Sequence, residues 1–455
     1  MPCERVPSLP DRLLSVSNRA KEAISIISRD RDAWLFFLTL GVCFVASSLR
    51  SELIIGPPTL FTEDASWSGR LLRSQTLTYL NARPDYFVVG NLLLLHASIL
   101  INSLLFGTSI SELPWIISLL SISFYSLVSA IVVPALRHHV SIIGRVAIAL
   151  MMTLVPLGSS SAEVFGRASN VGFSFAVLAT LLTIWRGQSR RSRIFIDIGL
   201  VLCMLTNPIS IAIIVVALAI QTRGNIIYDY RRNIFLYITI AAVSSAVAWR
   251  LSSILAVQQP PLSADGFFLV VIARALLYPF IFPWWKQPSA LLLLVTLTAL
   301  FCTFLAGLMH AKQKQGLIVL LTSLAVVAVS TWAQRRLLPQ QLGWFWSSYP
   351  DRYFYAQNVL CIAAFIWSCD ALARWGNAMW RTVSLTITLA ILVTWSANRS
   401  IIFDVEPVSC PPARNFGEQL ALGRPVVEQL SLTVVEVCPP GWYATFPAAY
   451  VEAWR

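Results

Sequence analysis

The chain has 455 residues, of which 56% are hydrophobic and only 12% are charged, and its mean hydropathy is +0.69. A soluble globular protein carries roughly twice that charged fraction, so the composition excludes a cytosolic enzyme and a disordered chain. The formal net charge is +12, which in another protein would suggest nucleic-acid binding. Here Lys and Arg gather in short segments between apolar runs, so we interpret the charge as a topology signal and expect no nucleic-acid partner.

The apolar runs predict an all-α polytopic membrane protein, because each can cross or nearly cross about 30 Å of hydrocarbon. A polar segment, 1–32, precedes the first run, and no signal-peptide cleavage site follows it, so we expect an uncleaved anchor and a bundle over 33–397. Two further apolar segments, 87–106 and 267–283, we interpret as half-inserted or juxtamembrane helices. About 11 spanning helices are predicted, at 33–49, 114–135, 141–157, 170–185, 194–206, 209–221, 233–253, 289–309, 316–332, 353–370 and 382–397.

Basic residues set the predicted orientation. With a cytoplasmic N-terminus, the five short inner loops hold 13 Lys and Arg residues in 45 positions, a several-fold higher density than in the outer segments. This is the bias that the positive-inside rule describes. The outer face then receives loop 50–86, segment 254–288 and an extracytoplasmic tail at 398–455. We expect any chemistry there, because the inner loops leave no room for a nucleotide-binding domain. These inner loops are 137–145, 186–193, 222–232, 310–315 and 371–381.

The first outer loop carries two adjacent acids, Glu63 and Asp64, and Arg70 follows them. The plainer interpretation is an ordinary solvated loop. A carboxylate partly removed from water at the lipid boundary can instead acquire a pKa suited to a general base, or can bind a metal. The pair is therefore a candidate catalytic site.

The second acidic feature is Glu163, which lies in a short outer loop together with Arg167 and Asn170. An acid at a helix N-terminus interacts favourably with the helix dipole. That interpretation accounts for one acid, but not for the polar cluster of Glu163, Arg167 and Asn170 at the edge of a hydrophobic bundle.

A third feature comprises Arg335 and Arg336, an aromatic-rich stretch, and then Arg352 and Tyr353 at the start of a span. It could be an interfacial aromatic belt with snorkelling arginines. The competing interpretation is a clamp for an anionic lipid, because arginine presents forked donors to phosphate. Arg352 at a helix start would add the positive end of that helix.

Together these features resemble the GT-C superfamily of integral-membrane glycosyltransferases, in particular the bacterial branch that uses polyprenyl-phosphate sugars. The likeness extends over most of the chain in architecture. It is carried by the pair Glu63-Asp64 before a half-inserted helix, by the spacing of Pro156, Glu163, Gly166 and Asn170, by Arg352-Tyr353-Phe354 at a helix start, and by the small outer tail.

The resemblance implies transfer of a sugar from a polyprenyl-phosphate donor to an envelope glycan or lipid acceptor, with inversion, at the periplasmic face of a bacterial inner membrane. Asp64 would be the first choice of base and Glu63 the second. A divalent metal could bind Glu63, Asp64 and Glu163, but no sequence feature requires one, so the cofactor stays unknown. The implied substrate-binding residues are Glu163, Asn170, Arg352, Tyr353, Arg335, Arg336 and Arg70.

The tail contains Cys410 and Cys438, and an oxidising outer compartment favours a disulfide between them. Closing a loop of about 28 residues would stabilise the tail by roughly 3 kcal/mol in the chain-entropy model. Residues 432–437 alternate between apolar and polar and predict a short strand.

Two other protein classes share this composition. A secondary transporter should show internal repeats and ionisable groups near mid-bilayer, whereas Asp197, Arg250 and Asp370 fall near predicted span ends. A lipid-linked glycan polymerase or ligase would share the basic outer loops but would not need the paired acids.

Overall fold

The computed structural model is 79% helical, and every structural statement below refers to the residues that it describes. These are residues 31–51, 59–73, 75–157, 164–186, 193–221, 226–252, 261–312, 314–334, 351–375, 378–403, 416–426, 429–438 and 441–452.

Within these ranges, eight helices are long and apolar enough to cross a membrane. This confirms the prediction of a multi-pass helical membrane protein. The eight are Arg31–Ser48 (the first helix), α4 (Val89–Phe106), α5 with α6 (Leu113–Ala130 and Val132–Ala135), most of α12 (Ile226–Ser252), Ala264–Trp284, α15 (Ala290–His310), α16 (Lys314–Gln334) and Arg352–Arg374, which contains α18 (Tyr355–Arg374).

Several predicted spans are shorter helices. At 1.5 Å per residue, a helix of 13 residues is about 20 Å long, which is less than the thickness of the hydrocarbon core. The predicted count of about 11 spans is therefore not confirmed by the lengths of the helices. The shorter helices are α7 (Ile142–Thr153), α9 (Ser174–Arg186), α10 (Arg193–Met204) and α11 (Ile209–Gln221). α19 (Ala378–Ala397) contains a shorter apolar stretch, Thr388–Ala397.

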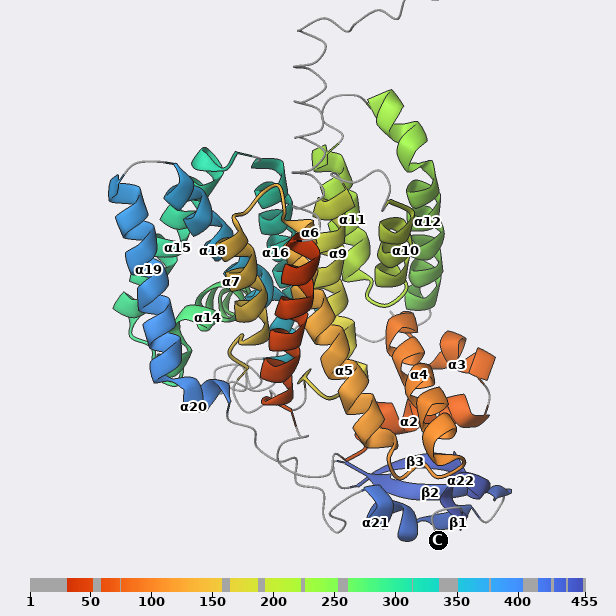
Figure 1. Ribbon diagram of the computed structural model, residues 1–455. Helices are drawn as coiled ribbons and strands as arrows, with labels where there is room; N and C mark the ends of the chain where they lie inside the picture. The colour runs from red at the N-terminus through yellow and green to blue at the C-terminus, as the bar shows by residue number, and fades with distance from the viewer. Residues whose placement is uncertain are drawn as a thin grey trace, which may run out of the picture.

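Both segments predicted as half-inserted helices reach spanning length and hydropathy, so sequence length does not separate them from the other spans. α4 nevertheless begins where α10 ends, because the Val89 amide donates to the Leu205 carbonyl (3.2 Å). From there α4 runs toward the C-terminal sheet rather than back through the bundle (Figure 1). The second segment is irregular and joins α13 (Ala264–Phe267), the π-helix η4 (Phe268–Leu277), α14 (Tyr278–Ile281) and the 3-10 helix η5 (Phe282–Trp284).

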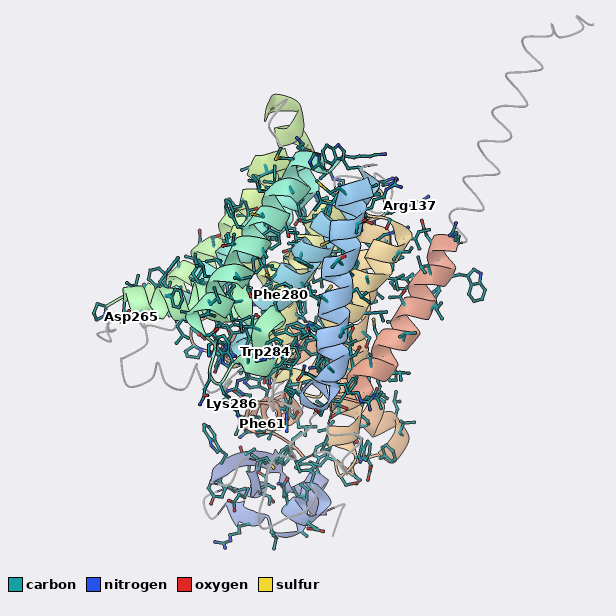
Figure 2. The ribbon with its side chains drawn as sticks, turned by 90° about the vertical axis from the view of Figure 1, so that its left-hand side faces the viewer. Phe61, Arg137, Asp265, Phe280, Trp284 and Lys286 are labelled. Atoms are coloured by element: carbon teal, nitrogen blue, oxygen red, sulfur yellow. The ribbon has the colours of Figure 1, made fainter. Side chains whose placement is uncertain are left out.

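The bundle has two ends, which we call upper and lower as they appear in Figure 1. Ion pairs join helix ends at the upper end: Asp32 contacts Arg137 (2.9 Å) and Arg145 (3.3 Å), and Arg186 contacts Asp197 (2.5 Å). These helix ends flank loops that were predicted as inner. Figure 2 shows Arg137 at the upper end and Phe61 at the opposite end, close to the C-terminal sheet.

The lower end carries two short helices and a small sheet. α2 (Thr62–Arg73) and α3 (Gln75–Asn81) lie beside α4, below the bundle (Figure 1). The tail folds as an antiparallel sheet in the order β1-β2-β3, flanked by α21 (Phe416–Ala421) and α22 (Ala448–Glu452). The predicted strand at 432–437 is confirmed as part of β2. The strands are β1 (Arg424–Val426), β2 (Gln429–Val437) and β3 (Trp442–Pro447).

Two apolar cores correspond to these two parts. The larger core fills the bundle, and the smaller one joins α2, α4, the start of α5 and the sheet. Arg50, fully buried after the first helix, donates to the carbonyls of Val155 (2.7 Å), Thr153 and Ile402 (2.9 Å). It thereby connects three segments at the lower end.

Candidate functional site

The C-terminal sheet holds the start of α2 in place. Phe61 forms a parallel bridge with Cys438, in which the Thr62 amide donates to the Cys438 carbonyl (2.9 Å) and the Cys438 amide donates to the Leu60 carbonyl (3.2 Å). The two acids Glu63 and Asp64 follow at once in the first turn of α2. Their position therefore depends on the tail, which is some 375 residues away in sequence.

Asp64 is 2% exposed and faces the loop before α9. Its carboxylate accepts hydrogen bonds from the amides of Ser169 (2.6 Å) and Ala168 (3.2 Å). Burial raises the pKa of Asp64 to about 7, although the nearby Arg167 guanidinium lowers it. Asp64 braces this loop, and it is not among the residues that line the cavity described next.

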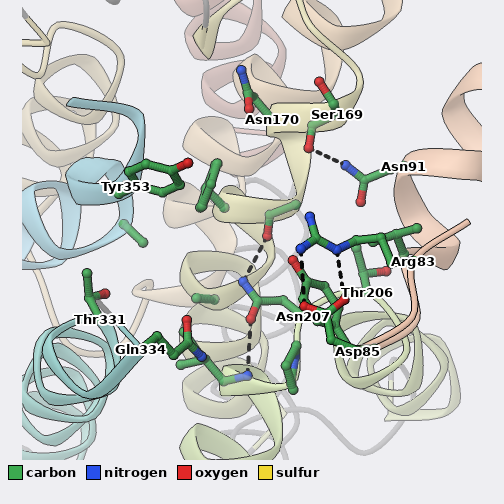
Figure 3. Close-up of a pocket in the computed structure, with 18 of the residues that line it drawn as sticks. Arg83, Asp85, Asn91, Ser169, Asn170, Thr206, Asn207, Thr331, Gln334 and Tyr353 are labelled. Carbon is green, nitrogen blue, oxygen red and sulfur yellow. Dashed lines mark hydrogen bonds and ion pairs between the residues drawn. The ribbon is translucent and has the colours of Figure 1, made fainter. Parts of the chain in front are cut away.

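A cavity of about 650 Å³ opens beside Glu63 at the lower end. The volume is in the range typical of small-molecule sites. Glu63 lines it and accepts a hydrogen bond from the Thr62 hydroxyl (2.9 Å). Figure 3 shows the polar side chains that surround the cavity.

One wall carries an arginine that is held by an acid. Arg83 makes two hydrogen bonds to Asp85, at 3.0 and 3.1 Å, and both residues line the cavity (Figure 3). Arg250, near the end of α12, donates to the Arg83 carbonyl (3.2 Å) and lies 3.9 Å over the Phe87 ring. The loop is thus fixed to α12, and the Arg83 guanidinium is kept at the cavity.

The opposite wall comes from the 3-10 helix η6 (Asp351–Phe354) and the first turn of α18. Arg352, Tyr353 and Gln357 line the cavity here. The Arg352 guanidinium donates to the Tyr353 hydroxyl (3.3 Å), and the Tyr353 ring lies edge-on to Phe173 at 5.6 Å. The cavity therefore has a cationic group on each of two walls.

The structure brings together four of the predicted site residues. Glu63, Asn170, Arg352 and Tyr353 all line the cavity. Arg70 does not: it is exposed at the far end of α2 and donates to the Asn81 carbonyl (3.1 Å).

The remaining predicted residues are not all described. Glu163, Arg335 and Arg336 lie outside the described residues. Cys438 is disulfide-bonded, but Cys410 also lies outside the described residues, so their pairing stays a prediction. Within the described ranges, no group of three or more His, Cys, Asp or Glu side chains could hold a metal.

Sequence analysis missed several residues of this cavity, namely Arg83 and Asp85 as a pair, Asn91, Asn207 and Gln357. Asn91 and Gln357 are polar residues in the first turns of apolar helices, a signal that could have identified them. Asn207 gave no such signal, because it lies before α11 rather than within it. Its side chain donates to the Gly172 carbonyl (3.0 Å), 35 residues away, and accepts from the Ile209 amide (3.1 Å).

No protein-family model and no curated protein sequence matches this chain.

Proposed function

We propose that the protein is a membrane glycosyltransferase that moves a sugar from a polyprenyl-phosphate donor to an envelope glycan or lipid acceptor, with inversion. One observation carries the proposal: a single cavity at one end of a membrane bundle presents the carboxylate of Glu63 together with the guanidinium groups of Arg83 and Arg352. Such a cavity offers a base for a hydroxyl and cations for a leaving phosphate.

In the proposed reaction, the acceptor hydroxyl oxygen attacks the anomeric carbon of the donor sugar. Its proton passes to Glu63, and the bond between the anomeric carbon and the phosphate oxygen breaks with its electron pair leaving on polyprenyl phosphate. Arg352 and Arg83 stabilise the charge that develops on the phosphate. We assign Glu63 rather than Asp64 as the base, because Glu63 lines the cavity while both carboxylate oxygens of Asp64 are bonded to backbone amides.

Asp64 and the loop at 168–170 then position the site. The carboxylate fixes the backbone that presents Asn170 to the cavity. The apolar side of the cavity is formed by Val247 and Leu251 of α12 and Val327 of α16, and we assign it to the first isoprene units of the donor.

The proposal places the lower end at the periplasmic face of a bacterial inner membrane and the N-terminus in the cytoplasm. α4 is then not one of the about 11 helices that cross the membrane.

The positions of charged residues in the bundle helices favour this enzyme over a transporter. Asp197 pairs with Arg186 and Asp370 with Arg374 at the upper end, and Arg250 bonds a loop at the lower end, so these charges are bonded at helix ends rather than free at mid-bilayer.

The test uses the purified full chain in lipid nanodiscs with radiolabelled polyprenyl-phosphate hexoses and pentoses as donors. The wild type is expected to release polyprenyl phosphate and transfer or hydrolyse the sugar. Glu63→Gln should lower kcat by about 100-fold or more while donor binding is kept. The matched control is Glu452→Gln, an exposed acid on α22, which should leave turnover unchanged. Turnover of no donor by the wild type, or full turnover by Glu63→Gln, would contradict the proposal.

A further inference from the structure

Two amide oxygens at the cavity have no hydrogen-bond partner within the described part of the chain. They are Oδ1 of Asn91 and Oε1 of Gln357. Both residues line the cavity, and their exposed fractions are only 1% and 0%. A buried acceptor without a partner is costly, so a hydrogen-bond donor brought by a ligand would stabilise each oxygen.

The orientation of each amide is settled by its other atom. Asn91 Nδ2 donates to the carbonyls of Ala168 (2.6 Å) and Ser169 (2.8 Å), and Gln357 Nε2 donates to the Tyr353 carbonyl (3.0 Å) and the Thr331 hydroxyl (2.8 Å). Exchanging nitrogen and oxygen would bring an oxygen against those carbonyls. The unpaired groups are therefore acceptors, and an amide oxygen accepts but never donates.

The two acceptors belong to different walls. Asn91 belongs to the first turn of α4. Figure 3 shows that its amide oxygen points away from Ser169 and toward Arg83. Gln357 belongs to the first turn of α18, beside Tyr353 and Thr331, which Figure 3 shows across the cavity. A ligand that satisfies both must carry at least two hydrogen-bond donors on a compact frame.

We infer that Asn91 and Gln357 determine specificity by accepting hydrogen bonds from two hydroxyl groups of one sugar ring in this cavity. The inference rests on the proposed function and deepens it, because it assigns which side chains read the donor sugar. A site built to bond hydroxyl groups rejects analogues that lack them, since its buried polar groups would be left unpaired. The cavity also presents the aromatic side chain of Trp67, which suits a pyranose ring.

Gly172 provides a variant that covers one acceptor without removing it. A Cβ atom at this position would lie 3.2 Å from Asn91 Oδ1 and 3.4 Å from its Nδ2. Gly172→Ala therefore places a methyl group against the unpaired oxygen while the side chain of Asn91 is retained. Gln357→Met removes the second acceptor at nearly constant length.

The experiment measures binding of farnesyl-phosphate mannose, glucose and galactose to the full chain in nanodiscs, with farnesyl phosphate as the sugar-free control probe. We expect the preferred sugar lipid to bind about tenfold more weakly to Gly172→Ala and to Gln357→Met, with farnesyl phosphate binding unchanged. A sugar lipid in which fluorine replaces one of the two recognised hydroxyl groups should bind about tenfold more weakly to the wild type. It should lose no further affinity in the variant that alters the acceptor of that hydroxyl.

Unchanged sugar-lipid affinity in both variants would overturn the inference and would mean that water satisfies these oxygens. That result would leave the proposed function standing, provided the wild type still turns over a donor. Equal loss of affinity for farnesyl phosphate and for its sugar derivatives would also overturn the inference, because the variants would then act on the phosphate or the lipid.

Discussion

Among the acids in the described ranges, Asp64 has the environment that differs most from that of an ordinary surface acid. Burial raises its pKa to about 7 from a reference value of 3.8, and its two partners are backbone amides of one loop. Its protonation is therefore coupled to folding of the lower end.

We predict that the stability of the protein falls as pH rises from about 4 to about 7. In this window the unfolded chain has released the Asp64 proton while the folded chain retains it, so the stabilisation present at low pH is lost as pH rises through the folded pKa. The loss is on the order of a few kcal/mol. Thermal unfolding in detergent across this range measures it. In Asp64→Asn the stability should vary much less with pH. An equally steep fall in that variant would show that another group causes the pH dependence.

Arg50 is a second residue with a testable structural role. Its guanidinium bonds three carbonyls from two distant segments, and it lies 4.9 Å over the Phe165 ring. Arg50→Lys keeps the charge but cannot reach all three acceptors. We expect the free energy of unfolding to fall by about 2 kcal/mol or more, which is measured as a lower unfolding temperature. Arg399→Lys, at an exposed position in α20 (Arg399–Ile402), is the control, and equal stability of the two variants would contradict this account.

At the scale of elements, α2 and β3 form the contact on which the site depends. Gly69 of α2 lies so close to the sheet that an added Cβ would be 2.2 Å from the Thr445 carbonyl oxygen. No side chain fits there unless the two elements move apart.

Gly69→Ala should therefore displace the tail from α2, destabilise the lower end by about 1–3 kcal/mol and lower sugar transfer through the position of Glu63. Limited proteolysis of the tail measures the displacement. Gly41→Ala is the matched control, because nothing lies within 4 Å of a Cβ atom at that position of the first helix. Tail cleavage at the same rate in both variants would show that the contact is not needed.

Some elements could be predicted from composition and period, and others could not. The apolar runs located the helices of the bundle, and alternation located β2. The short helices α2, α3, α21 and α22 were not predicted. The tail's docking on α2 was beyond reach, because a bridge between Phe61 and Cys438 leaves no local pattern. The π-helical course of η4 also lacks a signal, since its residues Phe268–Leu277 read as an ordinary apolar run.

Only part of the candidate site could be predicted, again because contacts between distant segments leave no local pattern in the sequence. Adjacent residues of a helix point in directions about 100° apart, so the pair Glu63-Asp64 could not reveal which acid faces a cavity. Only the contacts of Asp64 with Ala168 and Ser169 separate the two roles. Arg352 and Tyr353 were accessible to sequence analysis because a basic and an aromatic residue at a helix start already favour an anion site.

At the scale of the whole molecule, the bundle is a membrane anchor whose lower end collects the cavity, α2, α3 and the sheet (Figure 1). At the upper end, ion pairs such as Asp32 with Arg137 join helix ends. This asymmetry supports the proposal of a transferase that acts at one membrane face.

We therefore predict that labelling of introduced cysteines with a membrane-impermeant maleimide separates the two ends. A cysteine at exposed Glu452 should react in intact spheroplasts, whereas one at exposed Lys312 should react only after permeabilisation. Reaction of both positions in intact spheroplasts would contradict the assignment of the lower end to the periplasmic face.

The measurement that tests the central claim most directly is mass spectrometry of the envelope glycans in host cells with and without the protein. Deletion should remove one sugar from one glycan or glycolipid, and the wild-type chain should restore it. Glu63→Gln, present in the membrane at the same level, should not. Identical glycans with and without the protein, or full restoration by Glu63→Gln, would contradict the account.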